Sequence, residues 1–425
     1  MGLRPVWQAA PYTAALASPL ATALGALSAR EGWYVAVRAF GATGLGEVVP
    51  EPAWGTERPE AVAAGLARLG GRAAGQRGAT PLTRPAATLS RGEWAGDAGA
   101  PLSATEGAED VGAPLSATER VPVSGGEAMS PGEGLAAVAA WLAASGLRAQ
   151  SHPALHAGLE LALLDALSRA LGLSLATLLS DGRPPLPSLP TAALVGALPP
   201  EAAARAATRA VAAGHGTVKL KLDGRDDLAR ATAVRAAVGP GVSLRLDANA
   251  LWPDVEPAAE ALAAYAPLAP EFLEQPVAGL EPLAALQRRV AFPLAPDEAL
   301  VDEAACDLAL ALGLRVLVVK PMWRGGLLAA RALSARALAA GARVVLSSAL
   351  DRGVGTAGVL HLAAALPQPG CVGLGTAGLF AEGGALGGLQ PRGGRLAVPA
   401  GIGLGVPVQD PGLQEVMDRL AEGAR

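Results

Sequence analysis

The carboxy-terminal half of the chain alternates short apolar runs with alanine-rich segments of helical composition. The apolar runs are rich in Val and Leu, as buried strands are: AALVGAL, TVKLKLD, VSLRLDAN, EFLEQP, FPLAPDEA, LRVLVVKP, ARVVLSSA and GCVGLG. Polar residues end most of these runs at intervals of 23 to 27 positions: Lys221, Asp247, Glu274, Asp297, Lys320 and Ser347. A strand–helix unit repeated about eight times predicts a parallel α/β barrel, (β/α)8 or close to it.

The amino-terminal part of the chain has a different pattern. Residues 32–40 alternate and carry aromatic and β-branched side chains, which predicts a strand in an early antiparallel sheet. Three later segments are helical by composition: 58–69, 133–146 and 153–172. The third has an apolar face on which Glu160 and Asp165 also lie.

Residues 72–132 differ from both parts. They are Gly, Ala, Pro, Ser, Thr and Glu with almost no large apolar side chain, and GAPLSATE occurs in them twice. Two copies are too few for a solenoid, and neither copy has an apolar face to bury. We expect a mobile or disordered insertion without catalytic residues.

Composition and charge exclude several classes of protein. A chain of 425 residues suggests two or more domains, and its net charge of −4, without a basic run, argues against nucleic acid as a partner. No apolar run reaches the roughly 18 residues of a membrane span. The two cysteines, Cys306 and Cys371, lie far apart, which suggests neither a disulfide framework nor a zinc site and favours the cytoplasm. Three early prolines argue against a cleaved signal peptide.

Lysine is rare in this chain. Of the 34 Lys and Arg residues only Lys219, Lys221 and Lys320 are lysines. Arginine supplies surface charge equally well, but it keeps its proton, whereas a desolvated lysine can lose one near neutral pH. The three lysines are therefore candidates for proton transfer.

Three carboxylates end consecutive predicted strands: Asp247, Glu274 and Asp297. In a parallel barrel these three carboxylates lie at the same end of the barrel. Without a cation nearby, their negative charges would repel each other strongly. A divalent cation relieves that repulsion, and hard oxygen ligands without His or Cys favour Mg²⁺, with Mn²⁺ as an alternative.

Residues two apart on a strand share a face, so Lys219 and Lys221 point the same way, as do Arg245, Asp247 and Asn249. Neighbouring ammonium groups lower each other's pKa, which would let Lys221 act as a neutral base. Lys320 comes from the opposite side of the barrel. A base, a cation and a metal between them suit abstraction of a proton α to a carboxylate, with the metal holding the enediolate.

The motifs KLK, LRLDAN, EQP, APDE and VVKP, in this order, resemble the enolase superfamily and its muconate-lactonising subgroup. GEVVPEPAW resembles that family's amino-terminal capping domain. The resemblance implies a modified (β/α)7β barrel over residues 186–377 and an α+β capping domain over 1–185, to which residues 378–425 return.

Within the superfamily, the segments VVLSSALDRGVG and GCVGLGTAGLF look most like the o-succinylbenzoate synthases of menaquinone biosynthesis. Dipeptide epimerases carry Asp-x-Asp where this chain has Gly373 to Gly375, and mandelate racemases carry a catalytic His where it has Ser347 and Ser348. None of its four histidines matches that catalytic position. Some relatives racemise N-acylamino acids with the same two lysines, so synthase and racemase both remain open.

The resemblance also implies roles for single residues. Lys221 would remove the α-proton of a small carboxylate substrate and then assist departure of its hydroxyl, while Lys320 would stabilise the anionic intermediate, plausibly by a cation–π contact with the substrate ring. Glu298 is expected just behind the metal ligands. The expected substrate contacts are Arg245, Asn249, Ser347, Ser348 and Gly373.

Two glycine motifs offer a competing interpretation, because GVGTAG at 353–358 and GLGTAG at 373–378 both match GxGxxG. A dinucleotide site also needs an acidic residue at the end of the next strand, and none is found. A helix amino terminus that receives a substrate carboxylate explains the first motif better. We therefore expect no organic cofactor and no NAD-dependent oxidoreductase. Retention of both lysines argues against a non-catalytic relative, and no interface stripe predicts an oligomeric state.

Overall fold

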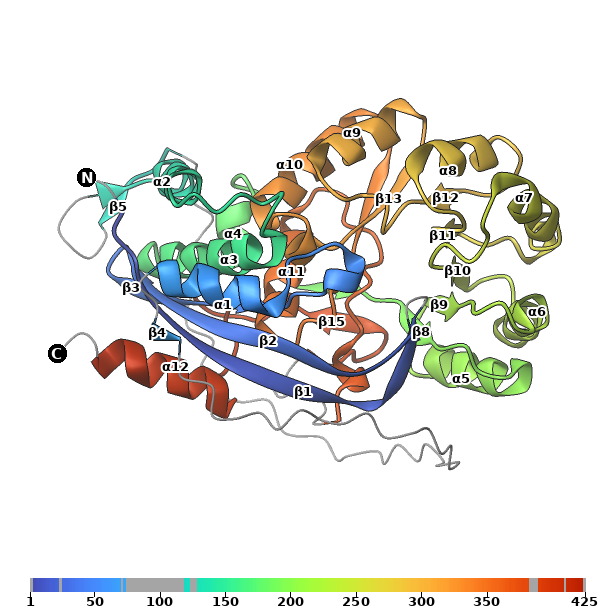
Figure 1. Ribbon diagram of the computed structural model, residues 1–425, viewed down its shortest axis with the longest axis horizontal. Helices are drawn as coiled ribbons and strands as arrows, with labels where there is room; N and C mark the ends of the chain where they lie inside the picture. The colour runs from blue at the N-terminus through green and yellow to red at the C-terminus, as the bar shows by residue number, and fades with distance from the viewer. Residues whose placement is uncertain are drawn as a thin grey trace.

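A computed structural model describes residues 3–22, 25–69, 72–73, 118–122, 128–381, 389–408 and 410–422. Most of the predicted insertion at 72–132 lies outside these ranges. Figure 1 shows a curved sheet with helices on one side of the molecule and a ring of strands surrounded by helices on the other.

The first part is built on an antiparallel sheet. Its strands lie in the order β3–β2–β1–β4, with the short β4 parallel to β1. Helices α1 to α3 cover one face, and α12 packs against β1 and β2 on the other (Figure 1). The bounds are β1 Val6–Thr22, β2 Gly25–Ala39, β3 Ala42–Val48, β4 Arg72–Ala73, α1 Pro59–Arg68, α2 Pro131–Ala144, α3 Pro153–Ala170 and α12 Pro411–Glu422.

Helix α3 is the core of this part. Fifteen of its residues are buried, including Glu160 and Asp165, and β3 packs directly on its backbone. The contact is close because β3 presents glycines: a Cβ on Gly44 would lie 2.1 Å from the carbonyl oxygen of Ala162, and one on Gly46 would lie 2.0 Å from that of Gly158. No side chain other than hydrogen fits there.

The second part is a ring of parallel strands with a helix after each of the first seven. The strands are β8 Ala193–Val195, β9 Thr217–Lys221, β10 Ser243–Asp247, β11 Phe272–Glu274, β12 Leu294–Ala295, β13 Val316–Val319 and β14 Arg343–Leu346. The helices are α5 Pro200–Ala212, α6 Asp227–Val238, α7 Val255–Ala263, α8 Leu280–Gln287, α9 Glu303–Ala311, α10 Leu327–Ala339 and α11 Val354–Ala365.

Backbone hydrogen bonds close the ring. The amide of Val318 in β13 donates to the carbonyl of Pro296 beside β12. The eighth position is a short extended segment: Gly373 pairs with Ser347 after β14, and Val372 pairs with Thr191 before β8. No helix follows this segment directly, so the barrel is (β/α)7β, as the family resemblance implies.

Short elements connect the two parts. The helix α4 Leu175–Leu179 follows α3, and β7 Ser188–Pro190 pairs with β15 Arg395–Ala397 from the tail. Two-residue strands β5 Val121–Pro122 and β6 Ala128–Met129 form a small hairpin. The 3-10 turns are η1 Pro52–Trp54, η2 Ala266–Leu268, η3 Pro321–Trp323 and η4 Ala377–Leu379.

The long β1–β2 hairpin reaches over the barrel (Figure 1). Leu16 of β1 forms an antiparallel bridge with Phe380, which follows η4, and the amide of Ala381 donates to the carbonyl of Ala15. The sequence pattern does not reveal β1, because alanines and two prolines hide its alternation.

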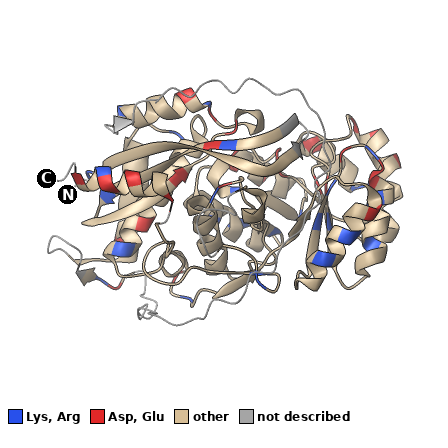
Figure 2. Ribbon diagram, turned by 90° about the horizontal axis from the view of Figure 1, so that it is seen from below, with Lys and Arg blue, Asp and Glu red and all other residues tan. Residues whose placement is uncertain are grey.

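Charged residues of both signs are interspersed along the helices at the two ends of the molecule (Figure 2). In the view shown, no face carries one sign alone. Among the described residues, no helix combines the length and apolar character needed to cross a bilayer. The predicted barrel with a capping domain is confirmed, and the boundaries at 185/186 and 377/378 stay predictions.

The packing of β3 on α3 predicts a large cost for one methyl group. We expect Gly46→Ala to lower the free energy of unfolding by about 3 kcal/mol, because its Cβ meets a helix carbonyl that cannot move alone. Urea denaturation measures this cost. Gly196→Ala is the matched control, since its Cβ enters open space; equal stability of the two variants would contradict the packing described.

Candidate functional site

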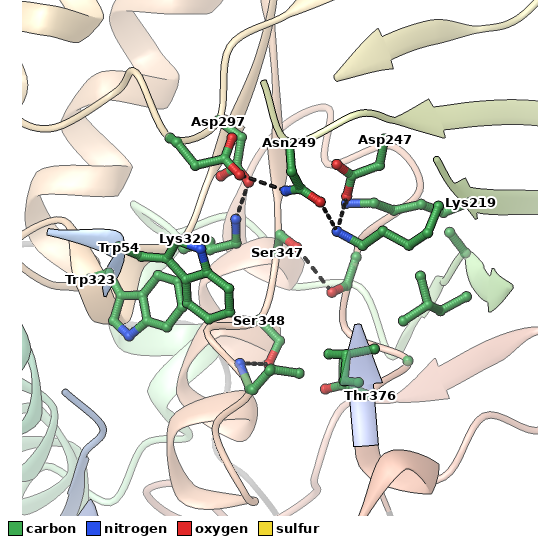
Figure 3. A pocket seen from close by; sticks show the side chains of 18 of the residues that line it. Trp54, Lys219, Asp247, Asn249, Asp297, Lys320, Trp323, Ser347, Ser348 and Thr376 are labelled. Carbon is green, nitrogen blue, oxygen red and sulfur yellow. Dashed lines mark hydrogen bonds and ion pairs between the residues drawn. The ribbon is translucent and has the colours of Figure 1, made fainter. Parts of the chain in front are cut away.

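A pocket opens at the end of the barrel where the strands finish, and the β1–β2 hairpin and η1 form part of its wall. Figure 3 shows its charged side chains on one side and two tryptophans on another. The lining residues are Leu20, Trp54, Ala192, Leu194, Lys219, Lys221, Asp247, Asn249, Asp297, Glu298, Lys320, Trp323, Arg324, Ser347, Ser348, Leu350, Gly373, Gly375 and Thr376.

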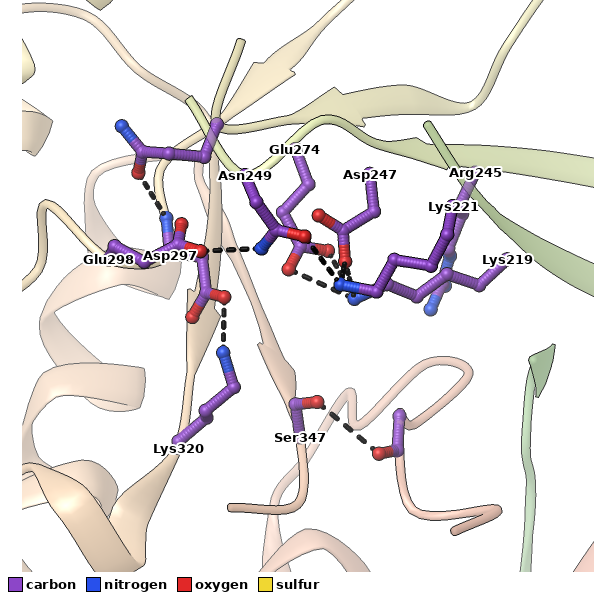
Figure 4. A network of polar contacts seen from close by, with 12 residues as sticks. Lys219, Lys221, Arg245, Asp247, Asn249, Glu274, Asp297, Glu298, Lys320 and Ser347 are labelled. Carbon is purple, nitrogen blue, oxygen red and sulfur yellow. Dashed lines mark hydrogen bonds and ion pairs between the residues drawn. The ribbon is translucent and has the colours of Figure 1, made fainter. Parts of the chain in front are cut away.

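The three predicted metal ligands are buried and close to lysine ammonium groups. Lys219 Nζ lies 2.8 Å from Asp247 Oδ2 and 2.7 Å from Glu274 Oε2, and Lys221 Nζ lies 2.6 Å from Asp247 Oδ2. Lys320 Nζ contacts Asp297 Oδ2. Figure 4 shows Lys320 approaching from the side opposite Lys219 and Lys221, as predicted from the strand positions.

The charges perturb one another strongly. Burial by itself would raise the pKa of Asp247, but the ammonium groups of Lys219 and Lys221 outweigh it and hold that pKa well below its usual range. Burial and the Asp247 carboxylate raise the pKa of Glu274 to about 8. For Lys219, burial favours the neutral form, but Asp247, Glu274 and Asp297 outweigh it and raise the pKa. Lys219 is therefore a permanent cation in this arrangement.

Lys221 is also held from its other side. Its Nζ donates to Asn249 Oδ1 at 2.7 Å, and Asn249 Nδ2 donates to Glu298 Oε1 at 2.5 Å. Asn249 has a left-handed backbone with a φ of 44°, which Asn tolerates better than most residues and which turns its side chain back over the strand ends. Asn249 was expected to contact substrate, and Glu298 was expected just behind the metal ligands. In the structure, Asn249 contacts the predicted base, Lys221, and Glu298 contacts Asn249.

The oxygen atoms of this cluster suit a hard divalent cation. Neither carboxylate oxygen of Asp247 makes a hydrogen bond of good angle, although Oδ2 lies within ion-pair distance of two lysines, and Glu298 Oε2 also has no hydrogen-bond partner. Burial of carboxylate oxygens that lack hydrogen-bond partners is unfavourable, and a bound cation would offset that cost. Among the described residues, however, no group of three or more carboxylate, His or Cys side chains is placed to hold a metal ion. Lys219 contacts Asp247 and Glu274 instead, and Lys320 contacts Asp297.

The predicted contacts on the last two strand ends lie in the pocket. Ser347 Oγ donates to the carbonyl of Gly373 at 3.3 Å, and a Cβ on Gly373 would lie 2.7 Å from that hydroxyl, so a side chain at this position would displace the hydroxyl. Ser348 Oγ instead faces Asp351 and accepts the amide of Leu350. Ser348 therefore shapes the loop as well as lining the pocket.

Arg245 was predicted to contact substrate, and the structure corrects this. It lies two residues before Asp247 and points into the barrel, but its guanidinium turns toward the opposite end. There it donates to Glu271 at 2.7 Å and to the carbonyl of Cys371, and stacks over Phe272. Arg245 does not line the pocket. A period of two gives the face of a strand but not the depth that a long side chain reaches.

The first glycine motif was expected to offer a helix amino terminus to a substrate carboxylate, and this is also wrong. Helix α11 begins there, but Glu47 of β3 accepts the amides of Arg352 at 2.8 Å and Gly355 at 2.9 Å. The protein's own carboxylate occupies the helix end. Glu47, the acceptor, lies 305 residues away in sequence from Arg352, which sequence reasoning had no means to detect.

Sequence reasoning missed the aromatic wall. Trp54 of η1 and Trp323 of η3 pack with ring centroids 5.1 Å apart, and Lys320 Nζ lies 5.7 Å from the Trp323 ring (Figure 3). Trp323 Nε1 donates to the carbonyl of Val49, which joins the barrel loop to the first part of the chain. The sequence offered one signal for this wall: Trp323 lies only three residues after Lys320, close to a predicted strand end.

The chain is similar in sequence to known proteins. The family model described as enolase C-terminal domain-like matches residues 201–411. The o-succinylbenzoate synthase of Mycobacterium ulcerans is 41% identical over 202 residues, covering 46% of this chain and 59% of the relative. That of Thermobifida fusca is 38% identical over 198 residues, covering 44% and 60%. The chain thus spans about three fifths of the length of these curated relatives.

Among solved structures, the N-succinyl Arg/Lys racemase of Bacillus cereus aligns over 98% of both chains with a TM-score of 0.74 and 19% identity. This likeness concerns the fold. It extends over the sheet part as well as the barrel.

The altered place of Arg245 generates a prediction. We expect Arg245→Ala to lower the free energy of unfolding by about 3 kcal/mol, because it breaks a buried ion pair with Glu271. Arg343→Ala removes the other, more exposed partner of Glu271 and should cost about 1 kcal/mol or less. Chemical denaturation measures both variants. Wild-type stability of Arg245→Ala together with a raised KM would restore Arg245 to the substrate site.

Proposed function

We propose that this chain is a member of the enolase superfamily and, within it, an o-succinylbenzoate synthase that dehydrates 2-succinyl-6-hydroxy-2,4-cyclohexadiene-1-carboxylate. The observation that carries the proposal is the pair Lys221 and Lys320, which face one pocket from opposite sides. Sequence likeness to two o-succinylbenzoate synthases, over 202 and 198 residues, supports the same choice.

The pocket suits a flat ring that bears carboxylates. Trp54, Trp323, Leu194 and Leu350 provide apolar wall, while the lysines supply positive charge at one side. An aromatic wall packs well against a planar diene and against the aromatic product. A substrate of this shape places its α-carbon between the two lysines.

We propose that Asp247, Glu274 and Asp297 hold Mg²⁺, with Mn²⁺ as a substitute. Bound there, the ion would stabilise negative charge that develops on the substrate carboxylate. Asp247 lies opposite both Lys221 and Glu274 in the strand register, and Asp297 follows two residues after Ala295, which is the partner of Glu274 on the next strand. Loss of the Lys219 and Lys320 contacts to these carboxylates would free the ammonium groups for the pocket.

In the proposed reaction, Lys221 in its neutral form removes the α-proton, and the electron pair moves toward the carboxylate. The protonated Lys221 then gives its proton to the leaving hydroxyl on the same face, so one water departs and the ring becomes aromatic. Asn249 holds Lys221 Nζ in place through its side-chain oxygen. One base serves both steps, which fits a syn elimination.

Lys320 has a different part. Burial by itself would lower its pKa, but Asp297 and Glu274 outweigh burial and raise it while Lys320 contacts these carboxylates. In the proposed reaction Lys320 takes part as a cation. A fixed cation opposite the base stabilises the anionic intermediate without proton transfer. Lys219, also cationic, adds positive charge next to Lys221.

A second activity, racemisation of N-acylamino acids, is favoured by the same two lysines. A base on each face of one carbon can remove a proton from one side and return it from the other. A racemase needs both lysines to exchange protons, whereas the synthase needs one base and one cation.

We further propose a role in menaquinone biosynthesis and a location in the cytoplasm, where two free cysteines would stay reduced.

The choice between the two activities is testable with purified protein and Mg²⁺. We expect rapid dehydration of the cyclohexadiene substrate, followed by ultraviolet absorbance, and slower racemisation of N-succinyl amino acids, followed by optical rotation. Lys320→Ala should lower kcat for dehydration by about 10²- to 10³-fold, because it removes a cation that faces the developing charge. Fast racemisation without dehydration would reverse the assignment.

The metal proposal has a test that needs no turnover. At 100 times its dissociation constant, Mg²⁺ should stabilise the protein by about 2.7 kcal/mol, visible as a raised Tm. Glu274→Gln should abolish this shift. Glu271→Gln, at the other end of the same strand, is the control that keeps it, since Glu271 pairs with Arg245 away from the pocket. An unchanged Mg²⁺ shift in Glu274→Gln would place the metal elsewhere.

A further inference from the structure

Helix α3 contacts the two loops that carry the pocket's tryptophans. At its amino end, Glu57 accepts the amides of Ala154 at 3.1 Å and Leu155 at 2.7 Å, and Glu57 lies three residues after Trp54. Further along, α3 meets the loop 320–328, which contains Lys320 and Trp323. One rigid helix therefore contacts both sides of the aromatic wall.

The contact with the second loop is made by Glu160. Its Oε1 accepts the amide of Leu328 at 3.0 Å, and the amide of Leu327 is a second partner. Both amides belong to the first turn of α10, so the carboxylate caps the helix that begins where the loop ends. Glu160 is only 3% exposed and lies outside the pocket lining, so it does not touch substrate.

The loop backbone is shaped to receive Glu160. Gly326 has a φ of +107°, and a Cβ on it would lie 2.3 Å from Glu160 Oε1. One turn earlier on α3, His156 Nδ1 lies 3.0 Å from the carbonyl oxygen of Gly325, which also has a positive φ of 86°. Two successive glycines thus bring the loop against two side chains on one face of α3.

A carboxylate at this place is costly. Burial raises the pKa of Glu160 to about 7, and the two backbone amides lower it only in part. A residue that merely filled space in the middle of an apolar helix would be better apolar. The cost is explained if the group fixes the position of the α10 amino end and of the loop before it.

We propose that Glu160 is a positioning residue that holds the loop carrying Lys320 and Trp323, and that α3 thereby sets the separation of the two pocket tryptophans. Glu160 acts through the backbone of Leu327 and Leu328. The kinetic part of its test rests on the proposed synthase function, and the structural part does not.

The test compares Glu160→Gln with Asp165→Asn. Glutamine keeps the size of Glu160, but it keeps one acceptor oxygen and turns an NH₂ group toward the second amide. Asp165 is an equally buried acid on the same helix, but it accepts the amides of Leu45 and Leu404, far from the loop. Hydrogen–deuterium exchange of peptides covering 320–330 is the first measurement, and kcat for dehydration is the second.

We expect Glu160→Gln to speed exchange in 320–330 about tenfold, as loss of one buried hydrogen bond does, and to lower kcat more than it raises KM. Asp165→Asn should leave exchange in 320–330 at the wild-type rate. If Glu160→Gln does not fold, Gly326→Ala approaches the same contact from the loop and should give the same local change.

Unchanged exchange in 320–330 would overturn the proposal, whatever the kinetics. Faster exchange over the whole chain would also overturn it, in favour of general stability. Faster exchange confined to this loop, in a protein that dehydrates nothing, would uphold the positioning role and reject the synthase function.

Discussion

The rest of this structure depends on the burial of three carboxylates at one end of a barrel. Asp247, Glu274 and Asp297 are each less than 5% exposed, and they end three neighbouring strands. Such a cluster is unstable without positive charge nearby. The chain supplies this charge with three lysines from two of its strand ends, those of β9 and β13, and in our proposal a divalent cation adds to it. The same arrangement that lowers the pKa values of Asp247 and Asp297 places Lys221 and Lys320 on two sides of the pocket.

The barrel strands bring the carboxylates and lysines to one end of the barrel, and the first part of the chain completes the pocket around them. Trp323 donates to Val49, Glu47 caps α11, and the β1–β2 hairpin reaches the barrel mouth at Leu20. Each contact joins an element before residue 60 to a loop that follows a barrel strand. The pocket is therefore formed by both parts of the chain, and the barrel alone would lack Trp54, one of the two tryptophans of the aromatic wall.

The sequence predicts features that depend on local patterns, and it does not predict contacts between residues that are far apart in the chain. The interval between strand ends and the rarity of lysine are local, and they suffice for the barrel and for Lys219, Lys221, Asp247, Glu274, Asp297 and Lys320. Arg245 fails because alternation gives the face of a strand but not the depth of a long side chain. The α11 amino end fails because its partner Glu47 lies on a distant strand. Trp54 and Trp323 meet only after folding, so no spacing rule brings them together.

In the proposed reaction, Lys221 is the base in a pocket whose carboxylates hold the metal. The most direct measurement is turnover of Lys221→Ala with bound Mn²⁺ counted in the same sample by electron paramagnetic resonance. We predict one Mn²⁺ per chain, as in the wild type, and no detectable dehydration. Substantial dehydration by this variant, with its metal in place, would contradict the claim.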